Sequence, residues 1–254
     1  GTGQAQENGR TGPTLDRILK TKTLRVGIAR LAPLAMLNKN NELVGLEVDV
    51  ARRLADDLGV TLRLVPTDMP NIMNGLNAGQ YDLIISGYSI TPERALHVNF
   101  SNPYYYTRIL LVASKQAAPG KTSAYFNSPS TTLGAVAGHS EIQVAGARFP
   151  QASLRLFETE ETLLADLLAG KIPAAVVSDQ LIRFNVAFHT NKLYLPDNKS
   201  LGAEPAAIAV RKGDQEILNF LNSWIAILQG EGWIEARRAF WYEQSSWIKD
   251  VPGL

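Results

Sequence analysis

The 254-residue sequence contains no cysteine, which excludes disulfide bonds, thiolate nucleophiles and cysteine-ligated zinc or iron–sulfur sites. Its three histidines lie far apart and none forms a His-x-x-x-His pair, so no metal site is expected. Charged residues interrupt every long apolar stretch, so no run approaches the roughly 18 residues of a membrane-spanning helix. Any chemistry must therefore come from hydroxyl, carboxylate, amide or basic side chains.

An excess of charge of one sign is also missing, because 25 Lys and Arg residues balance 24 Asp and Glu residues, leaving a net charge of +1. Binding to nucleic acid needs a marked excess of basic groups, so no nucleic-acid partner is expected. The glycine patterns of nucleotide-binding loops and the Gly-x-Ser-x-Gly hydrolase motif do not occur, and we expect no cofactor. With 45% hydrophobic residues, the chain is long enough for one large domain or two ordinary ones.

Hydrophobic periodicity predicts a β-α-β-α-β order in the first half of the chain and the same order again in the second half. The expected strands are 24–28, 61–65, 82–86, 133–137, 153–157 and 174–178, and the expected helices are 48–58, 72–76, 142–149 and 162–169. Alternating strands and helices favour a mostly parallel sheet with helices on its faces. We therefore predict an α/β protein with two similar lobes.

A further amphipathic helix is predicted near the C-terminus. Apolar residues recur at helical spacing from Ile217 to Leu228, with Asp214 as the expected N-cap and Gly230 or Gly232 at the end. Such an apolar stripe must be buried, and we expect it to pack on the first lobe, which would make that lobe discontinuous.

Polar residues follow several of the predicted strands, and ligands of open α/β sheets bind beyond the carboxyl ends of the strands. Arg94, which comes after the third strand, can hold a carboxylate by a bidentate pair, while Ser140 can assist it and Asp179 can accept bonds from an ammonium group. These three residues suit an α-amino acid. Two plainer alternatives stay open: Arg94 could serve a local cap or ion pair, and Asp179 could cap the helix after Ser178.

Four short motifs resemble those of the family 3 periplasmic solute-binding proteins: VGLEVDV at 44–50, DLIISG at 82–87, SITPER at 89–94 and FSNPYY at 100–105. The resemblance is densest over 24–112 and covers most of the chain. It implies the two-lobed type II periplasmic-binding-protein (Venus-flytrap) fold, which closes on an amino acid or related carboxylate and delivers it to an ABC permease. It also implies a monomer located in the periplasm after removal of a signal peptide.

The same resemblance implies domain boundaries and residue roles. After a disordered start at 1–13, the first lobe would comprise 14–106 and 206–254, and the second lobe 107–205. The carboxylate clamp falls on Arg94 with Ser89 and Ser140 as helpers, and the amine partner on Asp179. The other ligand-binding residues expected are Ser86, Gly87, Tyr88, Met69, Leu31 and His139, with Gln180 nearby. Leu31 and Met69 stand where the family often has aromatic residues, so an aromatic sandwich around a basic side chain is not expected.

Two rival functions remain. Residues 15–19 and 66–73 resemble the cyclohexadienyl dehydratases, which share this fold, but the acid of that branch lies three residues after its aspartate. In this sequence that position is Ile182, which cannot transfer a proton, so no catalytic residue is expected. The fold also occurs as the sensory domain of receptor kinases, and a membrane span or kinase after Leu254 would favour that alternative.

Overall fold

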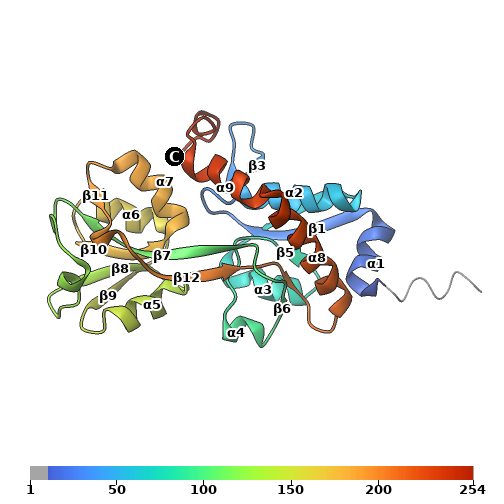
Figure 1. Cartoon of the computed structure of the whole chain (residues 1–254), viewed down its shortest axis with the longest axis horizontal. Coiled ribbons are helices and arrows are strands. Elements are labelled where there is room, and N and C mark those ends of the chain that lie inside the picture. Colours follow the sequence, from blue (N-terminus) through green and yellow to red (C-terminus); the bar gives the residue numbers. More distant parts are fainter. Residues whose placement is uncertain (1–10, 254) are drawn as a thin grey trace, which may run out of the picture. The chain divides into compact units, whose positions relative to one another are not determined.

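A computed structural model describes residues 11–253, apart from the side chains at 183–185, 187 and 188 (Figure 1). Most of the predicted disordered start, 1–13, lies outside the described residues. Its end was wrong, because Gly12 and Pro13 already belong to helix α1 (Gly12–Thr21). Among the helices of residues 11–253, none is long and apolar enough to cross a membrane.

The chain forms two compact units. Unit 1 runs to Tyr106 and resumes at Pro205, and unit 2 comprises Thr107–Glu204. The chain crosses from one unit to the other in strands β7 (Tyr105–Ser114) and β12 (Ser200–Ala206), and these two strands pair with each other.

Unit 1 is built on a five-stranded sheet in the order β4-β1-β5-β13-β6. Its strands are β1 (Thr23–Ala29), β4 (Thr61–Thr67), β5 (Leu83–Ile84), β6 (Asn99–Phe100) and β13 (Ala209–Val210). Its helices after α1 are α2 (Leu46–Leu58), α3 (Met69–Asn77), α4 (Pro92–Ala95), α8 (Gln215–Glu231) and α9 (Trp233–Glu243); a small hairpin, β2 (Met36–Leu37) and β3 (Leu43–Val44), and the 3-10 turn η3 (Ile248–Asp250) complete it. Strand β1 is parallel to β4 and β5, as the β-α-β order predicts, whereas β13 is antiparallel to β5.

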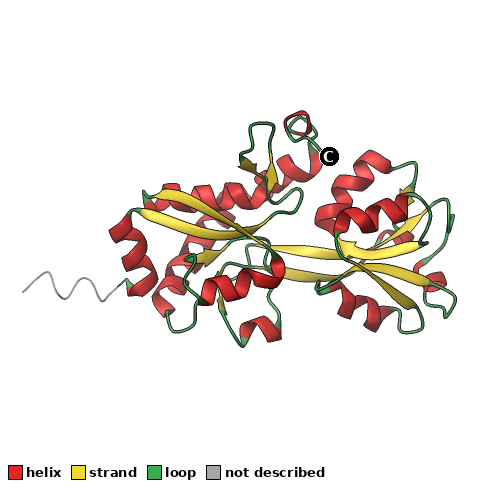
Figure 2. Cartoon of the chain, turned by 180° about the vertical axis from the view of Figure 1, so that it is seen from behind, coloured by secondary structure: helices red, strands yellow, loops and turns green. Residues whose placement is uncertain are grey.

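Unit 2 repeats this plan. Its sheet runs β11-β7-β10-β8-β9, with β8 parallel to β9 and β10, and β7 antiparallel to β10. The strands after β7 are β8 (Thr132–Val136), β9 (Ser153–Phe157), β10 (Ala174–Ser178) and β11 (Leu193–Tyr194), and the helices are η1 (Ser123–Phe126), α5 (Glu141–Arg148), α6 (Glu160–Leu168), α7 (Asp179–His189) and η2 (Pro196–Asn198). In each unit, helices cover both faces of the sheet (Figure 2). The predicted α/β class is confirmed.

Helix α8 has the caps that the sequence predicts. The Asp214 carboxylate accepts a bond of 3.2 Å from the backbone N–H of Ile217, and Gly232, with φ of +67°, ends the helix. Helix α8 contacts α1, and α9 contacts α2. The apolar stripe of α8 is therefore buried inside unit 1.

A buried tyrosine fixes the packing between β1 and α3 in unit 1. Tyr81 is fully buried, and a Cβ atom added at Gly27 would lie 2.5 Å from its ring. We expect Gly27→Ala to lower the free energy of unfolding by about 1–3 kcal/mol, because the ring must shift within a packed core. Gly146→Ala in α5 meets nothing within 4 Å and should stabilise the protein slightly. Urea unfolding of both variants checks this, and equal effects would contradict it.

Candidate functional site

Three neighbouring parallel strands of unit 2 end at one edge of its sheet. The register places Val136 of β8 beside Phe157 of β9, and Ala175 of β10 beside Gly134 of β8. The residues that follow β10, β8 and β9 therefore lie in a row along that edge. Asp179 follows β10, the pair His139 and Ser140 follows β8, and Glu160 follows β9.

Asp179 is a buried carboxylate whose hydrogen bonding is incomplete. It is 2% exposed, and its Oδ2 accepts a bond of 3.2 Å from Nε of Arg108. Among the described residues, no partner is found for its Oδ1. The N-cap of α7 is Ser178, which makes no side-chain capping bond, and the Asp179 carboxylate is engaged by Arg108. The next residue, Gln180, is buried and donates to Oγ1 of Thr107 at 2.8 Å.

Three further carboxylates contact His139 and Ser140, the residues that follow β8. Ser140 donates a hydrogen bond to Oε1 of Glu204. Nδ1 of His139 lies 3.7 Å from Oε2 of Glu141 and 3.8 Å from Oε1 of Glu160. Burial raises the pKa of Glu160 to about 8, against the opposing effect of His139. Oε2 of Glu160 is buried and has no hydrogen-bond partner within the part of the chain that the structure describes.

In unit 1, the predicted residues Ser86 to Ser89 follow strand β5. The Ser86 hydroxyl is occupied inside the unit, because it accepts a bond of 2.9 Å from the backbone N–H of Ala29. Gly87 has a φ of +62°, a backbone conformation that favours glycine. Tyr88 is 2% exposed and its ring stacks on Phe100 at a centroid distance of 5.8 Å. Ser89 is bridged to Ala206 by its backbone.

Arg94 is held in a defined position beside these residues. It lies in the short helix α4, whose N-cap Thr91 accepts a bond of 3.1 Å from the Arg94 backbone N–H. Its Nη1 donates to the backbone carbonyl of Ser89 at 2.8 Å, and its guanidinium carbon lies 4.1 Å from the centre of the Tyr88 ring. These contacts orient the Arg94 side chain. Among the ion pairs found in residues 11–253, none joins Arg94 to a carboxylate.

Leu31 and Met69 stand at the two positions where the sequence resemblance would lead one to expect an aromatic residue. Leu31 lies in the turn after β1, where it pairs with Ala35 through the backbone. Met69 begins α3 and packs against the buried cluster that includes Tyr88. Both side chains are half-buried. The face of Tyr88 is already covered by the guanidinium of Arg94, so this ring is engaged by the protein's own cation.

Sequence reasoning missed three charged residues near the predicted ones. Arg108, Glu160 and Glu204 contact Asp179, His139 and Ser140 respectively. The rule that polar residues beyond strand ends form sites would have selected Glu160, because it comes three residues after β9. No comparable signal marks Arg108 or Glu204, which lie within the long strands β7 and β12.

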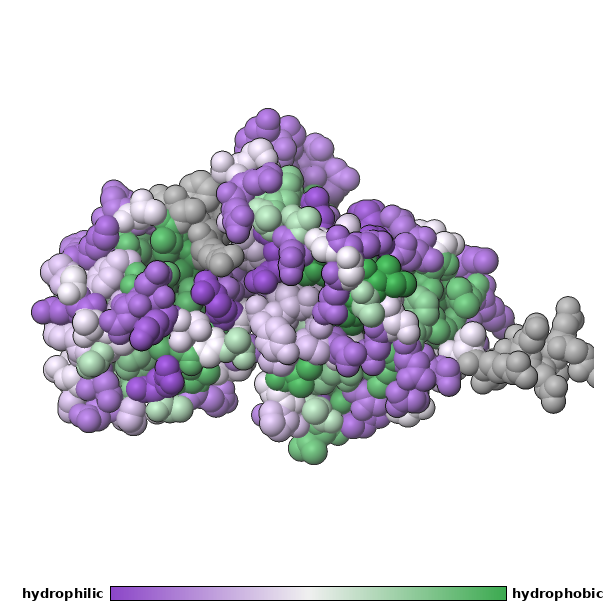
Figure 3. Space-filling model, in the orientation of Figure 1, coloured by the Kyte–Doolittle hydropathy of each residue, from purple (hydrophilic) through white to green (hydrophobic). Residues whose placement is uncertain are grey.

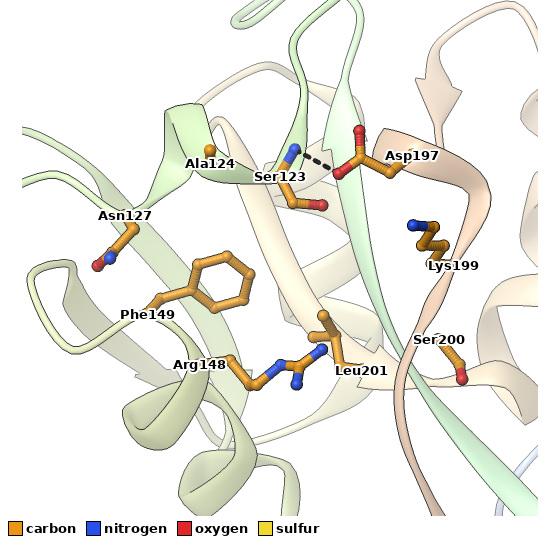
Figure 4. Close-up of a pocket in the computed structure, with 9 residues that line it drawn as sticks. All are labelled: Ser123, Ala124, Asn127, Arg148, Phe149, Asp197, Lys199, Ser200 and Leu201. Carbon is orange, nitrogen blue, oxygen red and sulfur yellow. Dashed lines mark hydrogen bonds between the residues drawn. The ribbon is translucent and has the colours of Figure 1, made fainter.

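Unit 2 also contains a separate open pocket of about 270 Å³, lined by residues of η1, α5, η2 and β12 (Figure 4). Among its lining residues, the backbone N–H of Ser123 donates to Oδ2 of Asp197 at 3.0 Å, and the side chain of Phe149 also lines the pocket. None of the predicted binding residues lines it. The face of the molecule in Figure 3 is mostly hydrophilic with small apolar patches, which is ordinary for a globular surface. No group of three or more potential metal ligands is found in the described part of the chain.

Comparison with known proteins shows relatives over nearly the whole chain. The L-cystine-binding protein TcyJ of Escherichia coli (strain K12) is 25% identical over 90% of this chain and 85% of its own length. The cyclohexadienyl dehydratase of Pseudomonas aeruginosa is 27% identical over 94% and 88%. A putative ABC-transporter binding component from Wolinella succinogenes, solved in complex with lysine, is 33% identical and covers 90% of this chain and 99% of its own, with a TM-score of 0.81.

These likenesses confirm the predicted two-domain fold of type II periplasmic binding proteins. A family profile matches residues 24–244, which is most of the chain and includes the strands of both sheets except for Thr23, the first residue of β1. The chain belongs to the bacterial extracellular solute-binding proteins, family 3.

Proposed function

We propose that the protein is an extracytoplasmic receptor that binds an α-amino acid or a closely related small carboxylate and delivers it to an ABC importer. Arg94 of unit 1 holds the ligand carboxylate with Ser89 and Ser140 as helpers, and Asp179 of unit 2 receives the α-ammonium group. The amino-acid-binding relatives support this class of ligand. The single observation that carries the assignment is the buried oxygen of Asp179 that has no partner.

A buried carboxylate oxygen without a hydrogen bond is costly, and native proteins leave few such atoms. An ammonium group offers three N–H donors and a positive charge, so it can satisfy Oδ1 of Asp179 while Arg108 keeps its bond to Oδ2. The buried setting strengthens this charge-assisted bond relative to one in water. Asp179 is therefore suited to a cationic donor that arrives with the ligand.

Arg94 has the matching properties for the other end of an amino acid. Its guanidinium has five N–H donors, and the Ser89 carbonyl takes one bond from Nη1. The remaining donors can bind both oxygens of a carboxylate, and the Tyr88 ring keeps the plane of the guanidinium fixed. Contacts that hold the side chain before binding lower the entropy lost when the ligand arrives.

An enzymatic role is the second candidate, because a cyclohexadienyl dehydratase is among the relatives. Ile182, at the position where that resemblance calls for an acid, is 1% exposed and packs in the hydrophobic core of unit 2. An aliphatic group there can neither donate nor accept a proton. We therefore assign the chain a binding function without catalysis.

The transport assignment also includes a location and a partner. The family is extracellular by its description, and we propose a periplasmic, monomeric receptor that meets an ABC permease at the membrane. A sensory domain is the alternative, and it predicts a membrane span or kinase after residue 254 in the complete gene product. A stop codon at that point, with a secretion signal before the chain, would instead support transport.

The function is tested by a thermal-shift assay on protein that has first been unfolded and then refolded. A ligand that binds only the folded state raises the melting temperature. A panel of the standard amino acids, related carboxylates, prephenate and arogenate should give a shift with one class of α-amino acid. Flat responses to every amino acid would contradict the proposal, and a shift with prephenate alone would favour the enzyme.

Asp179→Asn tests the role of the buried carboxylate. We expect the variant to lose about 1.5–3 kcal/mol of binding free energy for the amino acid, because one charge-assisted bond is lost, and far less for its deaminated analogue. Calorimetric titration of both ligands measures the difference. Asp166→Asn is the control, since Asp166 is also paired with an arginine, Arg155, but belongs to no proposed contact. Equal losses for the two ligands would mean that Asp179 is only structural.

A further inference from the structure

A second buried carboxylate with an unpartnered oxygen lies in the same row of strand ends as Asp179. Glu160 is 8% exposed, and its Oε2 has no hydrogen-bond partner among the residues described. Its Oε1 lies 3.8 Å from Nδ1 of His139, which in turn lies 3.7 Å from Oε2 of the buried Glu141. This group is separate from the contacts that the proposed function needs for the α-carboxylate and α-ammonium.

We propose that Glu160, with Glu141, forms a subsite for a positively charged group at the far end of the ligand side chain, so that the ligand class is a basic α-amino acid. This inference rests on the proposed function, because it takes the α-ammonium group to be at Asp179. Two carboxylates can offer a cation several oxygens, and the buried oxygen of Glu160 is the one that lacks a donor.

The spacing of the row fits such a ligand. Asp179 follows β10 and Glu160 follows β9, and β8 lies between these strands, so two interstrand spacings of roughly 4.8 Å, or about 10 Å in all, separate the two positions. The α-nitrogen and the terminal nitrogen of lysine are joined by six bonds of about 1.5 Å, which allow a span of about 7 Å. With a hydrogen bond of about 2.8 Å at each end, a side chain of this length reaches both carboxylates.

The charges around Glu160 make the binding of a cation dependent on pH. Burial raises its pKa to about 8, and the neighbouring Glu141 and Glu161 act in the same direction, whereas His139 opposes them. Helix α6 also packs on β8, β9 and β10; on β9, Arg155 is paired with Asp166 at 2.9 Å. Glu160 is therefore mostly protonated at pH 7 without ligand, and a cation that binds there must displace its proton.

The linkage fixes the sign of the effect. Below pH 8 each unit of pH raises the ionised fraction of Glu160 about tenfold, so the affinity for a cationic side chain should rise about tenfold from pH 6 to pH 7 and level off above pH 8. A neutral side chain needs no ionised Glu160, and its affinity should not follow this slope.

The experiment compares L-arginine with L-citrulline, which has nearly the same shape but no charge on its side chain, by calorimetry in buffers of different ionisation enthalpy. The wild-type protein should bind L-arginine at least tenfold more tightly than L-citrulline at pH 8 and release a proton at pH 7. Glu160→Gln should weaken L-arginine at least tenfold at pH 8, remove the proton release and the pH slope, and leave any binding of L-citrulline within twofold.

Glu161→Gln is the matched control, because Glu161 is the next residue on α6 and is exposed; it should change the L-arginine affinity by less than twofold. If other α-amino acids bind but L-arginine does not, or if Glu160→Gln leaves L-arginine binding unchanged or weakens both ligands equally, the subsite is wrong and the proposed function stands. If no α-amino acid binds to the wild-type protein, both are wrong. A melting temperature of Glu160→Gln close to that of wild type shows that the variant is folded.

Discussion

Arg94→Ala should weaken amino acid binding by about 2–5 kcal/mol, which corresponds to a loss of affinity of roughly thirtyfold to several thousandfold. The variant removes the only arginine that the proposed carboxylate site contains in unit 1, and the ligand carboxylate would lose both charge and paired donors in a desolvated place. Calorimetric titration, or competition with a labelled amino acid where binding becomes too weak, measures the change.

Two further variants make this result specific. Arg94→Lys keeps the positive charge but cannot form a bidentate pair, so its affinity should fall between those of the wild type and Arg94→Ala. Arg63→Ala removes an exposed arginine of β4 from the same unit and should leave affinity unchanged. The melting temperature should fall only slightly in Arg94→Ala, because the contact over the Tyr88 ring contributes about 0.5–1 kcal/mol. Unchanged amino acid affinity in Arg94→Ala would overturn the assignment of the carboxylate site.

The fold was largely predictable because apolar periodicity and strand order carry it. The runs at 24–28, 61–65, 133–137, 153–157 and 174–178 all became strands within a residue or two of the expected bounds, and their parallel pairing follows from the helices between them. The strand expected at 82–86 is shorter, at Leu83–Ile84, because the side chains of Asp82 and Ser86 accept the bonds of 2.9 Å from the backbone N–H groups of Arg25 and Ala29 at its two ends. When a side chain accepts the hydrogen bond from a backbone N–H group, that group no longer bonds to the neighbouring strand, and the strand pairing ends there.

The strands that link the units were not predictable from periodicity alone. β7 is continuously apolar from Ile109 to Ala113, and β12 is interrupted by Gly202 and Pro205, so neither strand shows a regular alternation. The partners of Asp179 and Ser140 lie in these two strands, at positions far away in the sequence. The rule that polar residues after strand ends form sites therefore identifies Asp179 and Ser140. It cannot identify Arg108 and Glu204, which contact them from the middle of other strands.

The same kind of long-range contact made Glu47 invisible in the sequence. In the sequence it appears only within the motif at 44–50, just before the predicted helix, yet it is fully buried, and the hydroxyl groups of Tyr104 and Tyr105 both donate to its carboxylate. Burial raises the pKa of Glu47 even though these bonds favour the ionised form. The motif at 100–105 thus has a structural role in unit 1, which a pattern of residue types cannot distinguish from a role in binding.

The largest loss of stability is expected from Asp82→Ala, which should lower the free energy of unfolding by about 3–5 kcal/mol. The Asp82 side chain is fully buried and accepts bonds from Nε of Arg17 at 2.6 Å, from the Arg25 backbone N–H at 2.9 Å and from Nη2 of Arg25 at 3.0 Å. It thereby joins α1 to β1 and to the start of β5. Removing it leaves two arginines without their common partner inside the unit.

The pH dependence of the free energy of unfolding shows whether Asp82→Ala destabilises the protein by removing a charge or by removing packing contacts. Burial opposes ionisation of Asp82, but the bonds from Arg17 and Arg25 outweigh it and lower the pKa of Asp82 below the ordinary value of 3.8. A lowered pKa in the folded state means that the stabilisation is complete above pH 3.8 and disappears as the pH falls through the pKa of the folded protein. Urea unfolding at several pH values should therefore show a large difference between wild type and Asp82→Ala at pH 7 that narrows in acid. A difference that stays constant down to the lowest pH would mean that packing, rather than charge, accounts for the role of Asp82.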